Sequence, residues 1–170
     1  MKIQRRGQAA ITDLFIAVAI FVVLIAITTL IWNLYNVRLD SRLDYDTMLL
    51  RGYHITEGFI RSPGYPEDWE TWATPAQTTQ LFGLAHDDHI ISPAKIERFV
   101  ELSDPAQPSY IALKETMKIS LYNYYFVLKA ENNVPVYSAG NHPSGKFTVN
   151  LARYVVYNGQ PHILEFAIWK

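Results

Sequence analysis

The sequence predicts an α+β protein, in which a long N-terminal helix precedes a small domain with an antiparallel sheet of about four strands. Three observations predict this class. An uncharged run from Leu14 to Trp32 contains thirteen Leu, Ile, Val or Phe residues among nineteen. A semi-apolar stripe at helical spacing continues from this run to about residue 61. The last third of the chain is rich in aromatic and β-branched residues and in turn signals.

The apolar run is long enough to cross a membrane. A helix rises about 1.5 Å per residue, so the run spans about 28 Å, close to the hydrocarbon thickness of a bilayer. Its large apolar side chains favour insertion by about 4 to 8 kcal/mol, and a buried helix of a globular protein usually keeps a polar face. The basic residues Lys2, Arg5 and Arg6 precede the run. The N-terminus is therefore expected inside, with the C-terminal domain exported across the cytoplasmic membrane.

The helix is expected to continue beyond the membrane, from about residue 9 to residue 61, with a possible kink at Asn33 or Gly52. Two separate helices are the alternative. Pro63 and Gly64 form a strong stop signal after it. The apolar positions recur at steps of three and four residues and comprise Leu34, Val37, Ser41, Tyr45, Met48, Gly52, Ile55 and Phe59.

The rest of the chain predicts a loop, two short helices and four strands. Residues 64–80 form the expected loop. Ser92 and Pro93 favour a helix start, with a hydroxyl N-cap and Pro in the first turn, and a second helix is expected over 110–117. Asn158 and Gly159 favour a type I′ hairpin turn. The expected strands cover residues 122–130, 134–138, 147–157 and 162–169.

Composition argues against several classes of function. The net charge is −1 and no basic patch is interleaved with aromatic residues, so no nucleic-acid partner is expected. Cysteine is absent, which excludes disulfides, thiolate nucleophiles and Cys-ligated metals. No phosphate loop, dinucleotide fingerprint or nucleophile elbow occurs, so we expect no enzyme activity, no catalytic residues and no cofactor.

Two local features could bind a ligand. His86, Asp87, Asp88 and His89 are metal-binding residue types, but consecutive side chains seldom point at one centre. An exposed loop without a metal is the expectation there. Trp69 and Trp72 lie in the loop over 64–80 and are expected either to fold over the helix as apolar lids or to face a ligand.

The N-terminal residues Arg5-Arg6-Gly7-Gln8-Ala9-Ala10-Ile11 resemble the class III signal peptides of archaeal type IV pilin-like proteins. The resemblance implies that a prepilin-type peptidase cuts between Gly7 and Gln8 on the cytoplasmic side and leaves the apolar helix on the mature chain. An uncleaved anchor with basic flanking residues is the alternative.

Later segments extend the resemblance over most of the chain. Residues 61–70 resemble an "SPGxPxxWE" signature of archaeal pilin-like proteins, and the segments 82–85, 92–99 and 154–159, with the closing Trp169, follow in the expected order. The resemblance implies a lollipop-like fold with a leader over 1–7, a transmembrane or filament-core helix over 8–34, its extracytoplasmic continuation over 35–62 and a globular domain over 63–170.

One acidic residue departs from the family pattern. Many type IV pilins carry Glu as the fifth mature residue, where it can neutralise the N-terminal amine of a neighbouring subunit. Here the fifth residue would be Thr12, and Asp13 is the sixth. One residue turns a side chain by about 100° on a helix. Asp13 could make the pairing from another face, or it could reach the lipid headgroups.

The function that the resemblance implies is structural. The chain would be a subunit, of the minor-pilin kind, in a type IV pilus-like surface filament or pseudopilus. Its partners would be the membrane, a prepilin-type peptidase and other pilin subunits in a homo- or hetero-oligomeric filament. The alternative from another class is a monomeric, single-span anchored binding module that recognises a ligand through the Trp69 and Trp72 loop.

Overall fold

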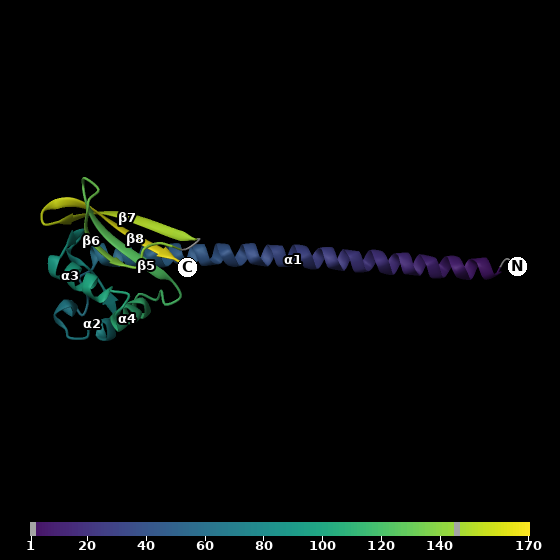
Figure 1. Ribbon diagram of the computed structural model, residues 1–170, viewed down its shortest axis with the longest axis horizontal. Helices are drawn as coiled ribbons and strands as arrows, with labels where there is room; N and C mark the ends of the chain where they lie inside the picture. The colour runs from purple at the N-terminus through teal and green to yellow at the C-terminus, as the bar shows by residue number, and fades with distance from the viewer. Residues whose placement is uncertain (1–2, 145–146) are drawn as a thin grey trace. The chain divides into compact units, whose positions relative to one another are not determined.

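The computed structural model describes residues 3–144 and 147–170, without the side chains of residues 3–11, 37, 40, 41, 76 and 77. The chain divides into two compact units, Met1–Asp44 and Tyr45–Lys170. The α+β class is confirmed: a long helix is followed by a curled sheet with additional short helices (Figure 1). The helices are α1 (Ile3–Arg61), the 3-10 helix η1 (Trp69–Thr71), α2 (Pro75–Thr78), α3 (Pro93–Leu102) and α4 (Pro108–Thr116).

Helix α1 confirms the predicted long helix and its end. It is helical without interruption through Asn33 and Gly52, so the alternative of two separate helices is wrong. It begins at Ile3, earlier than predicted, and ends at Arg61, just before Pro63 and Gly64. Proline lacks the N–H that would continue the backbone ladder, and Gly64 adopts a positive φ of 95°.

The main sheet has six strands in the order β3-β4-β7-β8-β5-β6. Its neighbours are antiparallel except β4 and β7, which pair in parallel through Ile90 and Val156, so the sheet is mixed. The four predicted strands are confirmed as the last four, and Asn158 and Gly159 make the predicted turn with φ values of 51° and 74°. The strands are β3 (Ala85–Asp87), β4 (Ile90–Ile91), β5 (Asn123–Ala130), β6 (Pro135–Gly140), β7 (Thr148–Tyr157) and β8 (Gln160–Trp169).

The loop expected over 64–80 contains ordered elements, which corrects that expectation. The short strand β1 (Gly64–Tyr65) pairs with β2 (Leu81–Phe82), and η1 and α2 lie between them. Both predicted short helices are confirmed: α3 begins at Pro93, and α4 begins at Pro108 because that proline suits the first helical turn. The predicted hydroxyl cap is wrong, since the side chain of Ser92 makes no capping hydrogen bond.

The hairpin of β3 and β4 caps the C-terminal end of α1. The last carbonyls of a helix have no partner within the helix. Here the N–H of Leu84 donates to the carbonyl oxygen of Phe59 at 3.1 Å, and the N–H of His89 donates to that of Ile60 at 2.7 Å. These backbone bonds fix the edge of the sheet to the end of the helix.

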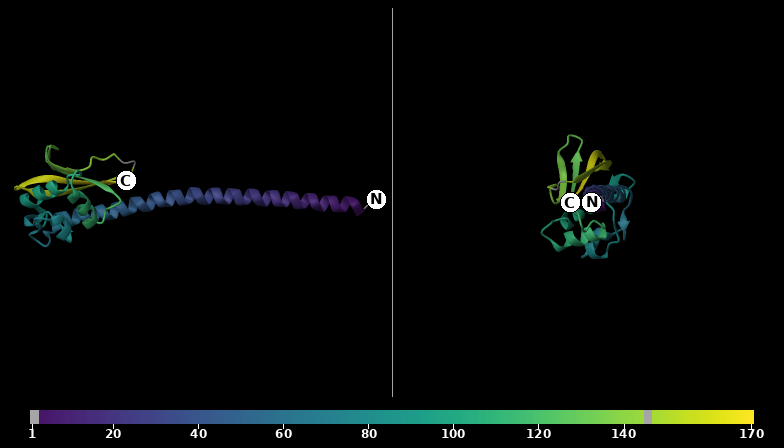
Figure 2. Two further views of the ribbon diagram at one scale, coloured as in Figure 1. Left: turned by 60° about the horizontal axis from the view of Figure 1, so that its bottom comes forward. Right: turned by 90° about the vertical axis from the view of Figure 1, so that its right-hand side faces the viewer.

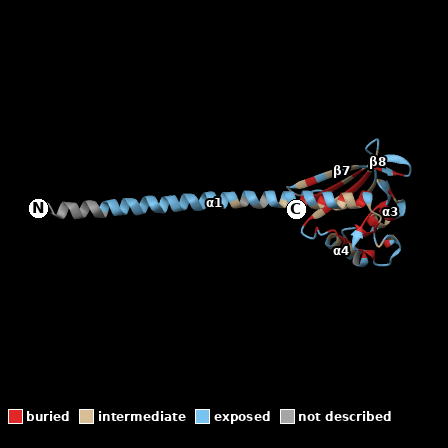
Figure 3. Cartoon of the chain, turned by 180° about the vertical axis from the view of Figure 1, so that it is seen from behind, coloured by how far each residue is buried: buried red, intermediate tan, exposed pale blue. Residues whose placement is uncertain are grey.

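The core of the second unit lies between one face of the sheet and residues 45–61 of α1 together with α3 and α4 (Figure 2). The predicted stripe is buried at Met48, Gly52 and Phe59. The ring of Phe59 packs edge-on against Phe99 and Phe166, with centroids 5.0 and 5.8 Å apart. Buried residues gather in this unit, whereas α1 is exposed along its apolar segment (Figure 3).

Candidate functional site

The most unusual surface of the molecule is the apolar part of α1. The most apolar 18-residue window of Thr12–Asn36 has a mean hydropathy of 3.1, and none of this window is buried. Phe15, Phe21 and Trp32 each expose more than 60% of their area. Soluble monomers seldom expose apolar patches larger than a few hundred Å². This single apolar helix is therefore compatible with a membrane anchor or a signal sequence.

The polar groups inside this segment suit an apolar environment. The hydroxyl of Thr28 donates to the carbonyl oxygen of Leu24 at 2.8 Å, and that of Thr29 donates to Ile25 at the same distance. In lipid every polar group must find a partner within the protein, and both threonines find theirs one turn earlier in the helix. Asp13 is the one acidic residue of the segment and is exposed. Its predicted pairing with a neighbouring N-terminus stays a prediction.

The predicted leader lies only partly within the described residues. Lys2 is outside them. Arg5, Arg6, Gly7 and Gln8 belong to α1 by their backbone, and their side chains are outside the description. Cleavage between Gly7 and Gln8 therefore stays a prediction.

Trp69 does not face a ligand, which corrects that part of the sequence prediction. Its side chain is fully buried, and its indole N–H donates to the carbonyl oxygens of Pro63 and Gly83 at 3.2 and 3.1 Å. The ring packs edge-on against Phe82 with centroids 5.0 Å apart. The alternative expectation, an apolar lid, agrees with this position. Buried Trp N–H groups need such partners, so Trp69 ties the segment after α1 to strand β2 and its neighbours.

Lys95 is a buried residue that the sequence analysis missed. Its ammonium donates to the carbonyl oxygens of Pro63 and Glu67 at 2.7 and 2.8 Å. Two of the segments that carry the resemblance, 61–70 and 92–99, therefore meet at this ammonium group. The indole of Trp69 joins segment 61–70 to segment 82–85. The signal was present, because Lys95 lies on the same face of α3 as the buried Ile96 and Phe99.

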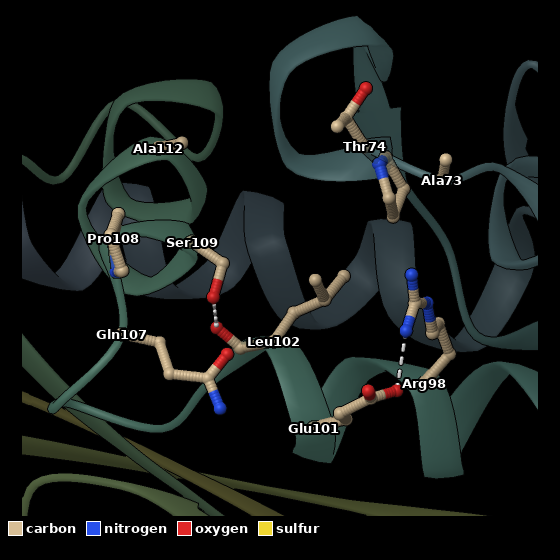
Figure 4. A pocket seen from close by; sticks show the side chains of 10 residues that line it. Ala73, Thr74, Arg98, Glu101, Leu102, Gln107, Pro108, Ser109 and Ala112 are labelled. Atoms are coloured by element: carbon tan, nitrogen blue, oxygen red, sulfur yellow. Dashed lines mark hydrogen bonds and ion pairs between the residues drawn. The ribbon is translucent and has the colours of Figure 1, made fainter.

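Trp72 is partly exposed and lies beside a shallow pocket of about 280 Å³. The guanidinium of Arg98 donates to the carbonyl oxygen of Trp72 at 3.2 Å and pairs with Glu101. Leu102 points into the pocket from α3, and the hydroxyl of Ser109 donates to its carbonyl oxygen at 3.0 Å (Figure 4). The polar groups of the pocket wall thus bond mainly to one another.

The candidate metal-binding residues lie in the hairpin of β3 and β4. His86, Asp87 and Asp88 are exposed, and a carboxylate oxygen of Asp88 lies 2.9 Å from Nδ1 of His89 and 3.9 Å from Nε of Arg61. Within the described residues no group of three or more His, Asp or Glu side chains is arranged to hold a metal ion. The hairpin presents an acidic turn.

Three buried or bridging tyrosines have raised pKa values. The hydroxyl of Tyr137 lies 3.1 Å from that of Tyr157 and donates to Glu97 at 3.2 Å. The hydrogen bond with Tyr157, followed by burial, raises the pKa of Tyr137. Burial raises the pKa of Tyr124 and of Tyr110. These groups hold their protons at neutral pH, and the hydroxyls of Tyr124 and Tyr137 donate hydrogen bonds to Ser103 and Glu97.

No family model, curated protein or solved structure matches the chain. The structure therefore shows the architecture of the chain. Its N-terminal apolar segment and the segment that packs in the α+β domain belong to one helix, α1, and the sheet of that domain is mostly antiparallel.

Proposed function

We propose that this chain is a structural subunit of a type IV pilus-like surface filament or pseudopilus, of the minor-pilin kind. A prepilin-type peptidase would remove residues 1–7, and Gln8 would become the first residue of the mature chain. The apolar helix would hold the subunit in the cytoplasmic membrane, with the N-terminus inside and the sheet domain outside, until it joins other subunits.

The observation that carries the proposal is the apolar segment Thr12–Asn36 on the same unbroken helix as the buried residues Met48 and Phe59. A signal sequence that is removed does not need to be part of a helix that completes a domain core. Cleavage after the apolar segment would separate it from residues 45–61, whereas cleavage after Gly7 removes only the beginning of α1 and leaves both segments joined. The class III leader pattern is thus the processing mode that suits this helix.

Assembly would transfer the apolar helix from lipid into a core of neighbouring helices. Lipid tails and apolar side chains are alike in polarity, so van der Waals packing between helices decides the balance. The many β-branched and Leu side chains between Leu14 and Ile31 offer such a packing surface. This role requires partners but no catalysis, no cofactor and no nucleic acid.

The test is the intact mass of the chain, isolated both from its native membrane and from sheared surface filaments. The proposal predicts the loss of residues 1–7, and with them three positive charges, in both fractions. Gly7→Leu should block processing and keep the chain out of the filaments, whereas Leu50→Ala, an exposed change on α1, should affect neither. A full-length chain in cells that process other prepilins would contradict the proposal.

A monomeric anchored binding module is the second candidate. The pocket beside the partly exposed Trp72 favours it, because pockets lined by apolar and a few polar groups are common ligand sites. This candidate predicts a full-length, monomeric chain in the membrane and none in the filament fraction. The same mass measurement therefore separates the two candidates.

A further inference from the structure

A second pocket of about 250 Å³ lies in the second unit, between α1, β2 and the end of α4. Its rim carries the cationic groups of Arg51 and Lys118 together with His54, and its lining contains no carboxylate. Neither Arg51 nor Lys118 forms an ion pair with any residue that the structure describes. The apolar part of the lining consists of Ile55, Phe59, Leu81, Phe82 and Met117.

Such a pocket suits a ligand in which an anionic group lies next to an apolar group. Unpaired cations beside a low-dielectric wall attract a carboxylate more strongly than cations surrounded by water. The apolar lining can bury an aliphatic side chain next to it, at about 25 cal/mol per Å² of apolar area. The ligand is therefore expected to combine acid and aliphatic surface.

The turn between β3 and β4 offers this combination elsewhere on the same domain. Asp87 and Asp88 are exposed at its tip, and the side chain of Asp88 exposes 69% of its area. Ile90 follows two residues later and is 42% exposed. The N–H of Asp88 donates to the carboxylate of Asp87 at 2.8 Å, and His89 adopts a positive φ of 61°. The turn thus holds two carboxylates beside an aliphatic side chain.

Within one chain the turn does not pair with the cations of the pocket. The carboxylate of Asp88 lies beside His89 and Arg61, and neither Asp87 nor Asp88 forms an ion pair with Arg51 or Lys118 in the part of the chain that the structure describes. The partner with the matching surface is a second copy of this chain. Because the two surfaces differ, the contact is head-to-tail and repeats from copy to copy.

We propose that the acidic turn Asp87–Asp88 of one copy docks in the pocket of Arg51, His54 and Lys118 of the next copy. The proposal rests on the proposed filament function and names the contact between neighbouring sheet domains. Charge complementarity would select this register and disfavour contacts between two pockets or two turns.

The chain has no cysteine, so the contact can be tested by engineered disulfides in the protein as it occurs in its native membrane and filaments. Asp87→Cys combined with Lys118→Cys should give a ladder of linked dimers, trimers and larger species under mild oxidation. A disulfide within one chain would leave a monomer, so only a contact between copies can give the ladder. The control pair of Lys118→Cys with Ser138→Cys, an exposed position on β6, should give a yield about tenfold lower because the two sites do not meet.

Charge reversal then tests the pairing itself. In the background of the first cysteine pair, Arg51→Glu should lower the ladder yield about fivefold, because it places like charges opposite each other. Adding Asp88→Arg should restore most of the yield. The proposal would be overturned if the control pair gave the same yield of linked species as the first cysteine pair. An Arg51→Glu defect that Asp88→Arg does not restore would also overturn it and would indicate another anion in the pocket, such as a lipid headgroup.

A failure of this contact can be distinguished from a failure of the proposed function. Correct processing and filament incorporation without the ladder would overturn this contact and leave the filament role in place. An unprocessed chain absent from filaments would overturn the filament role, and the contact that rests on it, whatever the pocket binds.

Discussion

Residues 12–36 and residues 45–61 belong to one unbroken helix, yet their side chains are distributed in opposite ways. The most apolar window of the first segment has a mean hydropathy of 3.1 and is exposed on every face. The second segment buries one stripe, which includes Met48 and Phe59, and exposes polar residues such as Asp46 and His54 on other faces. A helix with a single apolar stripe is complete once it packs on a sheet, whereas a uniformly apolar helix needs an apolar environment on every side.

The comparison also shows which segment of α1 the fold of the domain does not explain. The second segment is explained by packing within its own domain. The first finds no packing within the described chain, which is compatible with a membrane anchor or a signal sequence. Four substitutions test the contrast between these two segments and the packing of the domain.

Phe59→Ala should destabilise the folded domain most. The residue is 1% exposed and packs against the rings of Phe99 and Phe166. Removing a buried Phe side chain costs about 3 to 5 kcal/mol. Thermal unfolding of the full chain in detergent measures the loss. Leu50→Ala, an exposed change on the same helix, is the control and should stay within about 0.5 kcal/mol.

Phe21→Arg should weaken membrane association without affecting the domain. A central Arg costs about 2.5 to 3.5 kcal/mol in a membrane helix, and the favourable contribution of Phe is lost as well. Alkaline extraction of membranes should release a larger share of the variant, while its unfolding temperature stays that of the parent chain. Leu50→Arg should show neither effect. Equal retention of both variants would argue that residue 21 does not lie in lipid.

Tyr124→Phe should have a moderate effect that depends on pH. The hydroxyl donates to Oγ of the fully buried Ser103 at 2.9 Å, and leaving that group unpaired costs about 1 to 3 kcal/mol. Burial raises the pKa of Tyr124 above its ordinary value of 10.0, so the folded state holds this proton more tightly than the unfolded state. This contribution to stability is fully present below pH 10.0 and is lost as pH rises above it.

Alkaline unfolding measures this dependence. The parent chain should lose stability above pH 10.0, and the Phe variant should lose less over the same range. Identical slopes for the two proteins would show that Tyr124 is not the residue responsible.

Ser92→Ala should have the smallest effect. A Ser at a helix N-cap usually contributes about 1 kcal/mol. Here the side chain makes no capping hydrogen bond, so the loss should stay below about 0.5 kcal/mol. A loss of the usual size in thermal unfolding would mean that the hydroxyl does cap α3 in solution.

Long periodic elements could be predicted from the sequence. The course and end of α1 follow from a repeated apolar spacing and from Pro63, and the last four strands follow from alternation and the Asn158–Gly159 turn. The strands β3 and β4 could not be predicted. They have only two or three residues each, too few for a periodic signal, and backbone bonds to the end of α1 hold their hairpin.

The candidate site was less predictable. An aromatic residue in a Pro-rich loop is expected to form a lid, with a ligand surface as the alternative, and for Trp69 the carbonyl oxygens of Pro63 and Gly83 bind the indole N–H on the buried side. The pocket of Arg51 and Lys118 joins residues 67 positions apart in the sequence, and no local pattern links them. The leader residues show the converse: their pattern is visible in the sequence, and their proposed role as a peptidase site stays a prediction.

The central claim is that the two segments of α1 lie in different environments, and single-cysteine labelling tests it most directly. The chain has no cysteine of its own, so Ala26→Cys and Leu50→Cys each provide one reporter. With a membrane-impermeant maleimide on intact cells, the account predicts labelling of Leu50→Cys and none of Ala26→Cys until the membrane is dissolved in detergent. Equal labelling of both positions on intact cells would contradict the account.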